Sequence, residues 1–158
     1  MLAAYALASV LARCAPAVGR VTMSAVVAYE SGDQPYAIGD NTARRAYFPS
    51  ARQDAIRLAA ALLAEGHDLD LGYAQVNVAN VRAFGLGLDG AFDPCTNVWV
   101  ASRILRADYA RAARRYGFGQ VALAHALSAY NSGGFFAGLA YARGVYATAA
   151  RLRERSLP

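Results

Sequence analysis

The sequence has little charge, few cysteines, no lysine and no long hydrophobic run. Charged residues make up 17% of the chain and hydrophobic residues 56%, and the glycines follow no period, which excludes a disordered chain and a fibrous protein. No internal repeat or low-complexity linker divides the chain. Its 158 residues are near the usual size of one domain, so we expect residues 1–158 to form a single domain with an arginine-rich C-terminal tail over about 150–158.

No apolar run is long enough to cross a membrane. The longest candidate, "LAAYALASVLA" at the N-terminus, has about 11 residues, whereas a bilayer-spanning helix needs about 20. It resembles the apolar part of a signal peptide only in length, because no basic segment precedes it. We therefore expect an ordinary first helix that ends before Pro16, no stable insertion into a membrane, and no evident signal sequence in this chain.

Only two cysteines occur, Cys14 and Cys95, which are too few for a typical cysteine-rich zinc site but suffice for one disulfide. Pairing would close a loop of about 80 residues and stabilise the fold by about 4–5 kcal/mol in the chain-entropy model. The spacing alone is equally compatible with two buried free thiols. His67 and His125 are isolated, and "HDLD" at 67–70 is a weak metal signal, so we predict no metal and no cofactor.

The absence of lysine makes all sixteen basic residues arginines, and with eleven acidic residues the net charge is +5. This excess favours an anionic partner such as nucleic acid, acidic lipid or an acidic polymer. Several arginines crowd one predicted helix, where a solvated outer face is the simpler interpretation: Arg103, Arg106, Arg111, Arg114 and Arg115. No nucleic-acid motif accompanies them, so we predict no nucleic-acid partner.

Helical periods separated by glycine, proline and asparagine predict an all-α, mainly helical protein with minor β structure. After the first helix, the expected helices cover about 22–31, 50–65, 94–116, 120–129 and 136–154. Thr22 is a candidate N-cap, and Ser50 to Gln53 form a capping-box pattern. Residues 68–87 have no sustained period and are dense in glycine and asparagine, which predicts irregular structure of the kind that often lines sites.

Glu30 lies on the apolar face of the predicted helix 22–31, in its last turn, just before Gly32. Poor solvation and the negative end of the helix dipole both disfavour its ionised form, so both raise its pKa. A carboxyl group that stays protonated near neutral pH can donate a proton to a glycosidic oxygen as the bond breaks. Taken alone, Glu30 is explained more simply as a partly exposed glutamate at a frayed helix end.

Three separated motifs place Glu30 in a wider pattern. They are "ES" at 30–31 followed by "PYAIGDN" at 35–41, "GYAQVN" at 72–77 with Asn80 and "FGL" at 84–86, and "SAYNSG" at 128–133. In this order they resemble the lytic transglycosylases of the goose-type lysozyme superfamily, and most closely the type IV secretion branch. "CAPAV" at 14–18 and "DPCTN" at 93–97 look like the cysteine-bearing segments of that branch.

The resemblance implies a lysozyme-like domain with a substrate cleft, in which Glu30 is the catalytic acid and then the base. Ser31 is its neighbour in the motif, and Gln75, Tyr130 and Asn131 would line the cleft around the scissile sugar. Gln75 can bond donors and acceptors of an N-acetyl sugar, Tyr130 can hold Glu30 in place, and Asn131 can orient an acetamido carbonyl. The resemblance also implies that the two cysteines form a disulfide.

One position departs from the family pattern. The second motif is usually Gly-Leu-(Met or Gly)-Gln, whereas this chain has Gly72, Tyr73, Ala74 and Gln75. The glutamine keeps its place. A tyrosine in the leucine position changes either what packs behind the glutamine or what faces the sugar, and so bears on the shape of the subsite.

The mechanism depends on whether a second carboxylate is present, because ordinary hydrolytic glycosidases need one. The nearby candidates lie in polar, turn-like sequence that is typical of surface or capping residues: Asp33, Asp40, Asp68 and Asp70. With one acid, the resemblance implies a substrate-assisted route. The acetamido group of N-acetylmuramic acid stabilises the positive charge that forms at C1. The C6 hydroxyl of the same sugar then attacks C1 to give a 1,6-anhydro sugar.

We therefore expect a periplasmic lytic transglycosylase that cleaves the MurNAc-GlcNAc β-1,4 bond of peptidoglycan. It would open the cell wall for a type IV secretion or conjugation apparatus, whose components are further expected partners. A hydrolytic muramidase is one alternative, which would gain if Asp33 or Asp70 faced Glu30 across a cleft. A non-catalytic module that binds the cell wall or the secretion system is another.

Overall fold

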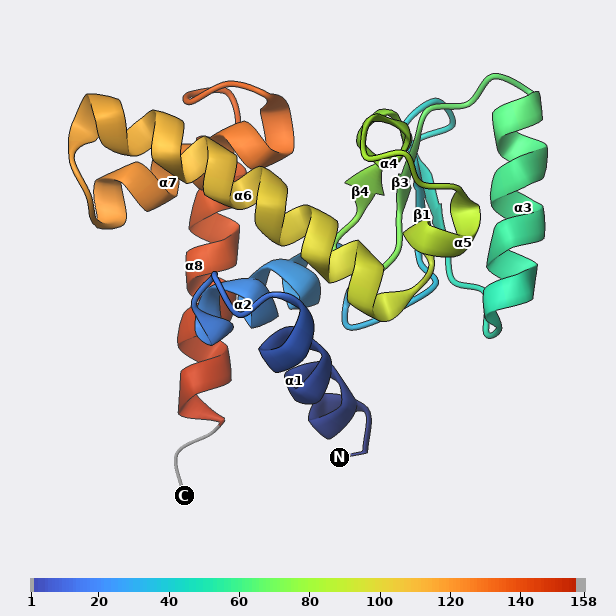
Figure 1. Cartoon of the computed structure of the whole chain (residues 1–158), viewed down its shortest axis with the longest axis horizontal. Coiled ribbons are helices and arrows are strands. Elements are labelled where there is room, and N and C mark those ends of the chain that lie inside the picture. The colour runs from blue at the N-terminus through green and yellow to red at the C-terminus, as the bar shows by residue number, and fades with distance from the viewer. Residues whose placement is uncertain (1, 156–158) are drawn as a thin grey trace.

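Eight helices and four short strands make up the described part of the chain, residues 2–155 of a computed structural model (Figure 1). The helices are α1 (Leu2–Cys14), α2 (Arg20–Ser31), α3 (Arg52–Ala64), α4 (Val78–Ala83), α5 (Leu88–Ala91), α6 (Pro94–Tyr116), α7 (Gln120–Ser132) and α8 (Leu139–Glu154). The strands are β1 (Ile38–Asp40), β2 (Arg45–Tyr47), β3 (Leu69–Leu71) and β4 (Val76–Asn77). The prediction of a mainly helical protein with minor β structure is confirmed. Of the predicted tail at 150–158, residues 156–158 lie outside the described part.

Glycines in the sequence predicted where helices end more accurately than polar N-cap candidates predicted where helices begin. Gly32 ends α2 in the left-handed conformation, with φ 60°, as expected. Thr22 is not an N-cap, because α2 already starts at Arg20 and the carbonyl of Gly19 accepts the first helical hydrogen bond from Met23. The capping box at 50–53 was also wrong, since Ala51 precedes α3 and no side chain caps that helix.

The α7 helix extends three residues beyond its predicted end, to Ser132, before left-handed Gly133 stops it. Tyr130 and Asn131 are therefore held on a helix and not in a turn. The α8 helix starts at Leu139, three residues later than expected, because the segment after Gly133 first turns back on α7. There the Oγ of Ser128 accepts a hydrogen bond from the backbone N–H of Gly138, at 2.9 Å.

The strands form one antiparallel sheet in the order β2-β1-β3-β4. Leu69 and Leu71 are fully buried, and Asp70 between them points to the other side of β3, as the alternation of a strand requires. The prediction of irregular structure over 68–87 was wrong, because this range holds β3, β4 and α4. Strands of two or three residues are too short to show a period in the sequence.

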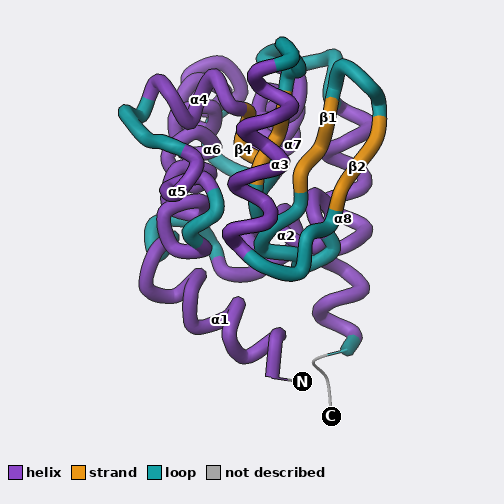
Figure 2. Tube along the Cα trace, turned by 90° about the vertical axis from the view of Figure 1, so that its right-hand side faces the viewer, coloured by secondary structure: helices purple, strands orange, loops and turns teal. Residues whose placement is uncertain are grey.

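The α6 helix crosses the molecule and joins its two ends (Figure 1). The α7 and α8 helices lie toward one end, and the sheet lies toward the other, with α3 on the side of the sheet away from α7 and α8. Figure 2, turned by a quarter, shows α3 on the near side of the sheet, with β1 and β2 visible beside it. One hydrophobic cluster contains Val26 of α2, Leu71 of β3 and Leu105 of α6, and burying each such side chain contributes about 1.5–3 kcal/mol.

Asn97 fastens α6 to the sheet region. Its side-chain amide donates hydrogen bonds to the carbonyls of Leu71 and Ala91, both at 2.8 Å, and its oxygen accepts from the N–H of Ala74 at 2.9 Å. Gly72 allows this close approach, since its φ is 77° and a Cβ there would lie 2.5 Å from the Asn97 amide nitrogen. These contacts set the position of the 72–75 turn.

A disulfide joins Cys14, at the end of α1, to Cys95, in the first turn of α6, with their Cα atoms 5.3 Å apart. The pairing that the resemblance implied is thus confirmed. The bond spans 81 residues of sequence, and in the chain-entropy model such a loop stabilises the fold by about 4–5 kcal/mol. Over the described range, none of the helices combines the length and the apolar character that crossing a membrane would require.

Candidate active site

A cleft of about 610 Å³ opens where α2, α6 and α7 meet the sheet. Four of the five side chains predicted for the site line it: Glu30, Gln75, Tyr130 and Asn131. They come from three separate parts of the sequence, which the fold brings to one place. The cleft is open to solvent, which suits a polymeric substrate that must enter and leave along its length.

Glu30 is the next-to-last residue of α2, and its carboxyl group is largely buried. Its Oε1 accepts a hydrogen bond of 2.6 Å from the hydroxyl of Tyr141, on α8. Burial raises the pKa of Glu30 from its ordinary 4.5 to about 7, and the negative charge of Asp70 acts in the same direction. The Tyr141 hydrogen bond favours the ionised form but does not offset burial. Near neutral pH, Glu30 can therefore both give and take a proton.

Tyr141, and not Tyr130, holds the Glu30 carboxyl group. The hydroxyl of Tyr130 instead donates to the backbone carbonyl of Ala74 at 2.8 Å, and so ties α7 to the second motif. Tyr141 is buried, and its ring packs edge-on against Tyr29 at 5.2 Å. Sequence reasoning missed Tyr141, although it lies within the predicted helix 136–154. A buried tyrosine needs a partner for its hydroxyl, and that is the signal that could have found it.

Gln75 is fixed by the backbone around it. Its amide nitrogen donates to the carbonyls of Ala37, at 3.1 Å, and Gly72, at 2.9 Å, so its donors are used within the protein. Its φ of 46° is unusual for a residue other than glycine. Gly39 leaves room for its oxygen, since a Cβ there would lie 2.6 Å from Oε1. Gln75 therefore presents an oxygen acceptor to the cleft.

Tyr73, which stands where the family pattern usually has leucine, changes what packs behind Gln75. Tyr73 is only 8% exposed, belongs to the hydrophobic core and does not line the cleft. The alternative, that Tyr73 faces the sugar, is wrong for this reason. Burial raises the pKa of its hydroxyl, with the charge of Asp33 acting in the same direction.

Asn131 and Ser31 have different positions. Asn131 is exposed in the last turn of α7 and lines the cleft, where its amide is free to meet a substrate. Ser31 is 5% exposed, and its Oγ donates back to the carbonyl of Val27 at 3.1 Å. Because Ser31 is turned into its own helix and lies outside the cleft lining, the structure does not bring this predicted site residue to the site.

The sheet wall of the cleft carries two carboxylates and two amides that sequence reasoning did not place there. The amide nitrogen of Asn41 donates to Asp68 and Asp70, at 3.2 and 2.9 Å, and that of Asn77 donates to the same two carboxylates, at 2.8 and 2.9 Å. Burial raises the pKa of Asp70, the two amides lower it, and the charge of Asp68 raises it again, with a net rise. Asp68 is exposed, as expected of a surface residue, and Asp70 is half-buried, but both line the cleft, which the sequence did not predict.

Asp40 stays outside the cleft and shapes it indirectly. It accepts hydrogen bonds from the N–H groups of Thr42 and Ala43, at 3.1 and 2.9 Å, and lies 2.7 Å from Nδ1 of His67. Burial alone would raise the pKa of Asp40, but these hydrogen bonds bring it below its ordinary value. Its predicted capping role fits these bonds, which hold the turn beside Asn41. Asp33 does not line the cleft either.

The third wall is α6. Asp108 lies there with a mostly buried carboxylate that accepts a hydrogen bond of 2.7 Å from Arg111. Burial raises the pKa of Asp108, and its pairing with Arg111 acts against this rise. Across residues 2–155 no three histidine, cysteine, aspartate or glutamate side chains gather as a metal-binding group.

Comparison with known proteins agrees with the resemblance seen in the motifs. The model of the Transglycosylase SLT domain family matches residues 10–150. The "Type IV secretion system protein virB1" of Brucella suis biovar 1 (strain 1330) is 42% identical over 127 residues, which are 80% of this chain and 53% of the relative. "Protein virB1" of Agrobacterium fabrum (strain C58 / ATCC 33970) is 36% identical over 141 residues, 88% and 57% of the two chains.

The chain thus spans about half the length of the curated relatives it matches. No solved structure matches it. The matched range contains all three motifs and both cysteines.

Proposed function

The chain belongs to the Transglycosylase SLT domain family, and from this premise we propose that it is a lytic transglycosylase acting on the MurNAc-GlcNAc β-1,4 bond of peptidoglycan. The observation that carries the proposal is Glu30, a largely buried carboxyl group with a pKa of about 7 that lines an open cleft. Near pH 7 a large share of such groups holds a proton, and the leaving sugar oxygen needs one.

In the proposed reaction Glu30 acts twice. Its proton goes to the oxygen of the breaking glycosidic bond, and the Tyr141 hydroxyl stabilises the carboxylate that remains. The acetamido oxygen of the muramic acid stabilises the positive charge at C1. The C6 hydroxyl then attacks C1 and returns its proton to Glu30, so that the enzyme is restored, a 1,6-anhydro sugar forms and no water is consumed.

Two side chains are suited to hold the N-acetyl groups. Gln75 offers an acceptor for an amide N–H, because its own donors are occupied by Ala37 and Gly72. Asn131 offers a free amide that can donate to an acetamido carbonyl. Gln75 and Asn131 are therefore the proposed substrate-binding residues, and Ser31, which lies outside the cleft lining, is not one of them.

The disulfide and the relatives support a periplasmic setting for the enzyme. A disulfide persists in an oxidising compartment, which supports the periplasm, where peptidoglycan lies. The relatives named as type IV secretion system proteins support a role in opening the wall for such an apparatus. We propose residues 1–158 as a single transglycosylase domain.

Hydrolysis of the same bond is the second candidate, and a specific observation favours it. Asp70 lines the same cleft as Glu30, and its charge helps to raise the pKa of Glu30. A second carboxylate in this relation is what a hydrolytic glycosidase uses to attack C1 or to activate water. Against this role, both Asp70 oxygens already accept amide hydrogen bonds, from Asn41 and Asn77.

Mass spectrometry of muropeptides released from purified peptidoglycan separates these candidates. For a lytic transglycosylase we expect anhydromuramyl products from the wild type and from Asp70→Asn, and none from Glu30→Gln. Products with a reducing end, lost in Asp70→Asn, would establish the hydrolase instead. A wild type that binds the wall without releasing any product would establish a binding module.

A further inference from the structure

A second hollow lies across α6 from the cleft. The cleft uses Ile104, Asp108 and Arg111, whereas Trp99, Arg103 and Arg106 line a hollow of about 460 Å³ beside the disulfide. With about 3.6 residues per turn, these two sets fall on nearly opposite sides of the helix. A ligand in the second hollow would therefore leave the cleft free.

This hollow continues into another of about 440 Å³, which ends at Tyr109 and Phe118. The two share Ala17 and Arg106, so they form one furrow between α6 and the loop that joins α1 to α2. We call this furrow the outer groove. Its ends are marked by Trp99 and Phe118.

The outer groove is basic and its charges are unpaired. Arg13, Arg103 and Arg106 line it, and no acidic residue does. None of these three arginines has an ion pair or a hydrogen bond to another of the described residues. Arg111 on the cleft side of the same helix, by contrast, is held by Asp108. The outer groove therefore carries three positive charges that have no carboxylate partner among the described residues.

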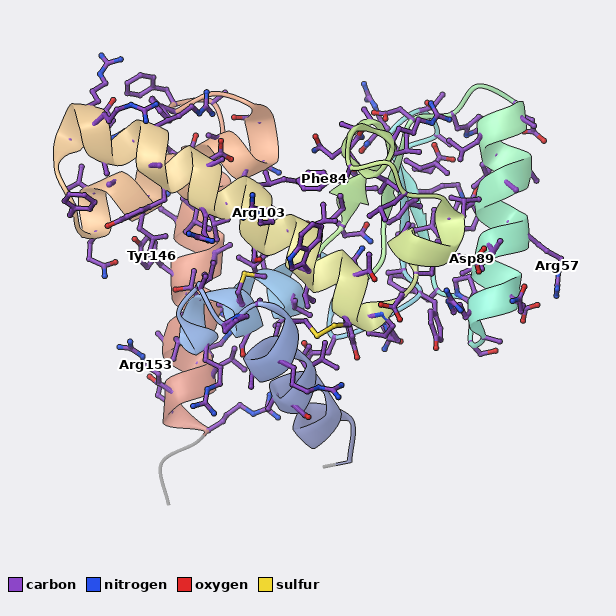
Figure 3. The ribbon with its side chains drawn as sticks, in the orientation of Figure 1. Arg57, Phe84, Asp89, Arg103, Tyr146 and Arg153 are labelled. Carbon is purple, nitrogen blue, oxygen red and sulfur yellow. A yellow bond between two sulfur atoms is a disulfide. The ribbon has the colours of Figure 1, made fainter. Side chains whose placement is uncertain are left out.

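The outer groove also exposes aromatic side chains. Trp99 is 43% exposed and Phe118 is 91% exposed, although burial would stabilise both. Phe84, at the end of α4, packs edge-on against Trp99 with ring centroids 5.7 Å apart. Figure 3 labels Phe84 at α4 and Arg103 on α6. Exposed tryptophan, phenylalanine and arginine together are typical of surfaces that bind another protein.

We propose that the outer groove binds an acidic segment of a partner protein. Carboxylates of the segment pair with Arg13, Arg103 and Arg106, and its apolar side chains pack on Trp99 and Phe118. The lining between the arginines is apolar, with Pro16, Ala17, Ala110 and Leu123 among its residues. A peptide that mixes acidic and apolar side chains complements this lining, whereas a phosphate backbone would satisfy only the arginines. The binding does not depend on the cleavage reaction.

Trp99 is the sole tryptophan of the chain, so its fluorescence reports directly on this groove. The test is selection of random displayed peptides of about 12 residues on the immobilised full chain, followed by titration of the synthesised winners against Trp99 fluorescence. We expect the winners to be rich in aspartate and glutamate next to aromatic or proline residues, and to change the Trp99 emission when they bind.

The decisive variant is the double substitution Arg103→Glu and Arg106→Glu, at two exposed positions. It should raise the Kd of the selected peptides by about tenfold or more, because rim charges turn from attractive to repulsive. The matched control is Arg143→Glu, an exposed arginine on α8 outside the groove, which should change the Kd by less than about twofold. Circular dichroism would verify that each variant folds.

Four outcomes would overturn the proposal. Winners without enriched acidic residues, or winners that bind the double variant as tightly as the wild type, would show that the groove is not an acidic-segment site. Binding of a single-stranded DNA oligonucleotide as tight as that of the winners, and equally sensitive to the double variant, would assign the groove to nucleic acid. A wild-type dimer in sedimentation that the double variant abolishes would assign it to a second copy of the chain.

Discussion

Two walls of the cleft, the helical wall with Glu30 on α2 and the sheet wall with Asp70 on β3, treat their carboxyl groups differently. On the helical wall, Glu30 receives one hydrogen bond, from Tyr141, in surroundings that raise its pKa to about 7. On the sheet wall, each oxygen of Asp70 receives an amide hydrogen bond, and these bonds act against the rise caused by burial. The difference teaches that surroundings, and not residue type, separate the two groups: burial brings the pKa of Glu30 to about 7, which suits the proposed proton donor, and the charge of Asp70 makes a smaller contribution in the same direction.

The largest expected effect comes from removing the proton donor. Glu30→Gln keeps the shape of the side chain and an oxygen that can accept from Tyr141, but it cannot transfer a proton. We expect release of soluble fragments from purified peptidoglycan to fall by about 10²–10⁴-fold. A variant that keeps more than about a tenth of the wild-type rate would exclude Glu30 as the acid.

The same variant should be more stable than the wild type at high pH. In the unfolded chain Glu30 loses its proton near 4.5, and in the folded protein near 7, so between these values the folded state holds more protons and its stability falls as pH rises. Above this window the cost is about 3 kcal/mol, which Glu30→Gln avoids. Urea unfolding below pH 4.5 and above pH 7 should show a gain only at the higher pH. An equal gain at both would mean that the pKa is not raised.

Tyr141→Phe removes the hydrogen bond to Glu30 and leaves Glu30 itself unchanged. The hydroxyl of Tyr141 lowers the pKa of Glu30, so its loss should raise that pKa and move the alkaline fall of activity to higher pH. The carboxylate left after proton transfer also loses its partner, and we expect kcat to fall by about tenfold. A pH-rate profile tests both. An unshifted profile with normal kcat would assign the 2.6 Å contact no part in the reaction.

Asp70→Asn changes only the sheet wall, and Asp68→Asn is its control within the same amide network. Removal of the Asp70 charge should lower the pKa of Glu30 and move the alkaline fall of activity to lower pH, with about a twofold loss of rate near pH 7. Asp68→Asn disturbs the same Asn41 and Asn77 bonds and should leave the profile in place. A loss of 10²-fold or more in Asp70→Asn alone would make Asp70 a second catalytic carboxylate, at about the scale that acid-base groups contribute.

Gly39→Ala leaves Glu30 and Tyr141 unchanged and should affect substrate binding alone. The added methyl group would lie 2.6 Å from the Gln75 oxygen and would push the amide out of the position that its hydrogen bonds fix. We expect KM to rise by about fivefold with little change in kcat, as for the loss of one hydrogen bond of about 1 kcal/mol. An unchanged KM would remove Gln75 from the substrate-binding residues.

The helical wall could be predicted from the sequence far better than the sheet wall. Helix α2 has a period, a glycine stop and a carboxylate on its apolar face, and all three signals lie within 12 residues. The sheet wall has strands of two or three residues, and its network joins Asn41 to Asp68, Asp70 and Asn77 across a loop and a helix. Neither a period nor a local motif records such a contact.

Other contacts were hidden by distance along the chain. Tyr141 lies 111 residues from Glu30, and only packing of α8 on α2 brings the two together. The disulfide was undecided from spacing and depended on the resemblance to a known family. The motif suggests that Tyr130 holds Glu30, whereas the Tyr130 hydroxyl donates a hydrogen bond to the carbonyl of Ala74.

The central claim is that Glu30 is an acid held in its protonated form near neutral pH. The most direct measurement follows the ¹³C chemical shift of the Glu30 side-chain carboxyl group by NMR as pH is raised, with Glu30→Gln used to assign the signal. The account predicts a midpoint of about 7. A midpoint near the ordinary 4.5 would contradict it, because Glu30 would then be ionised at the pH where it has to donate a proton.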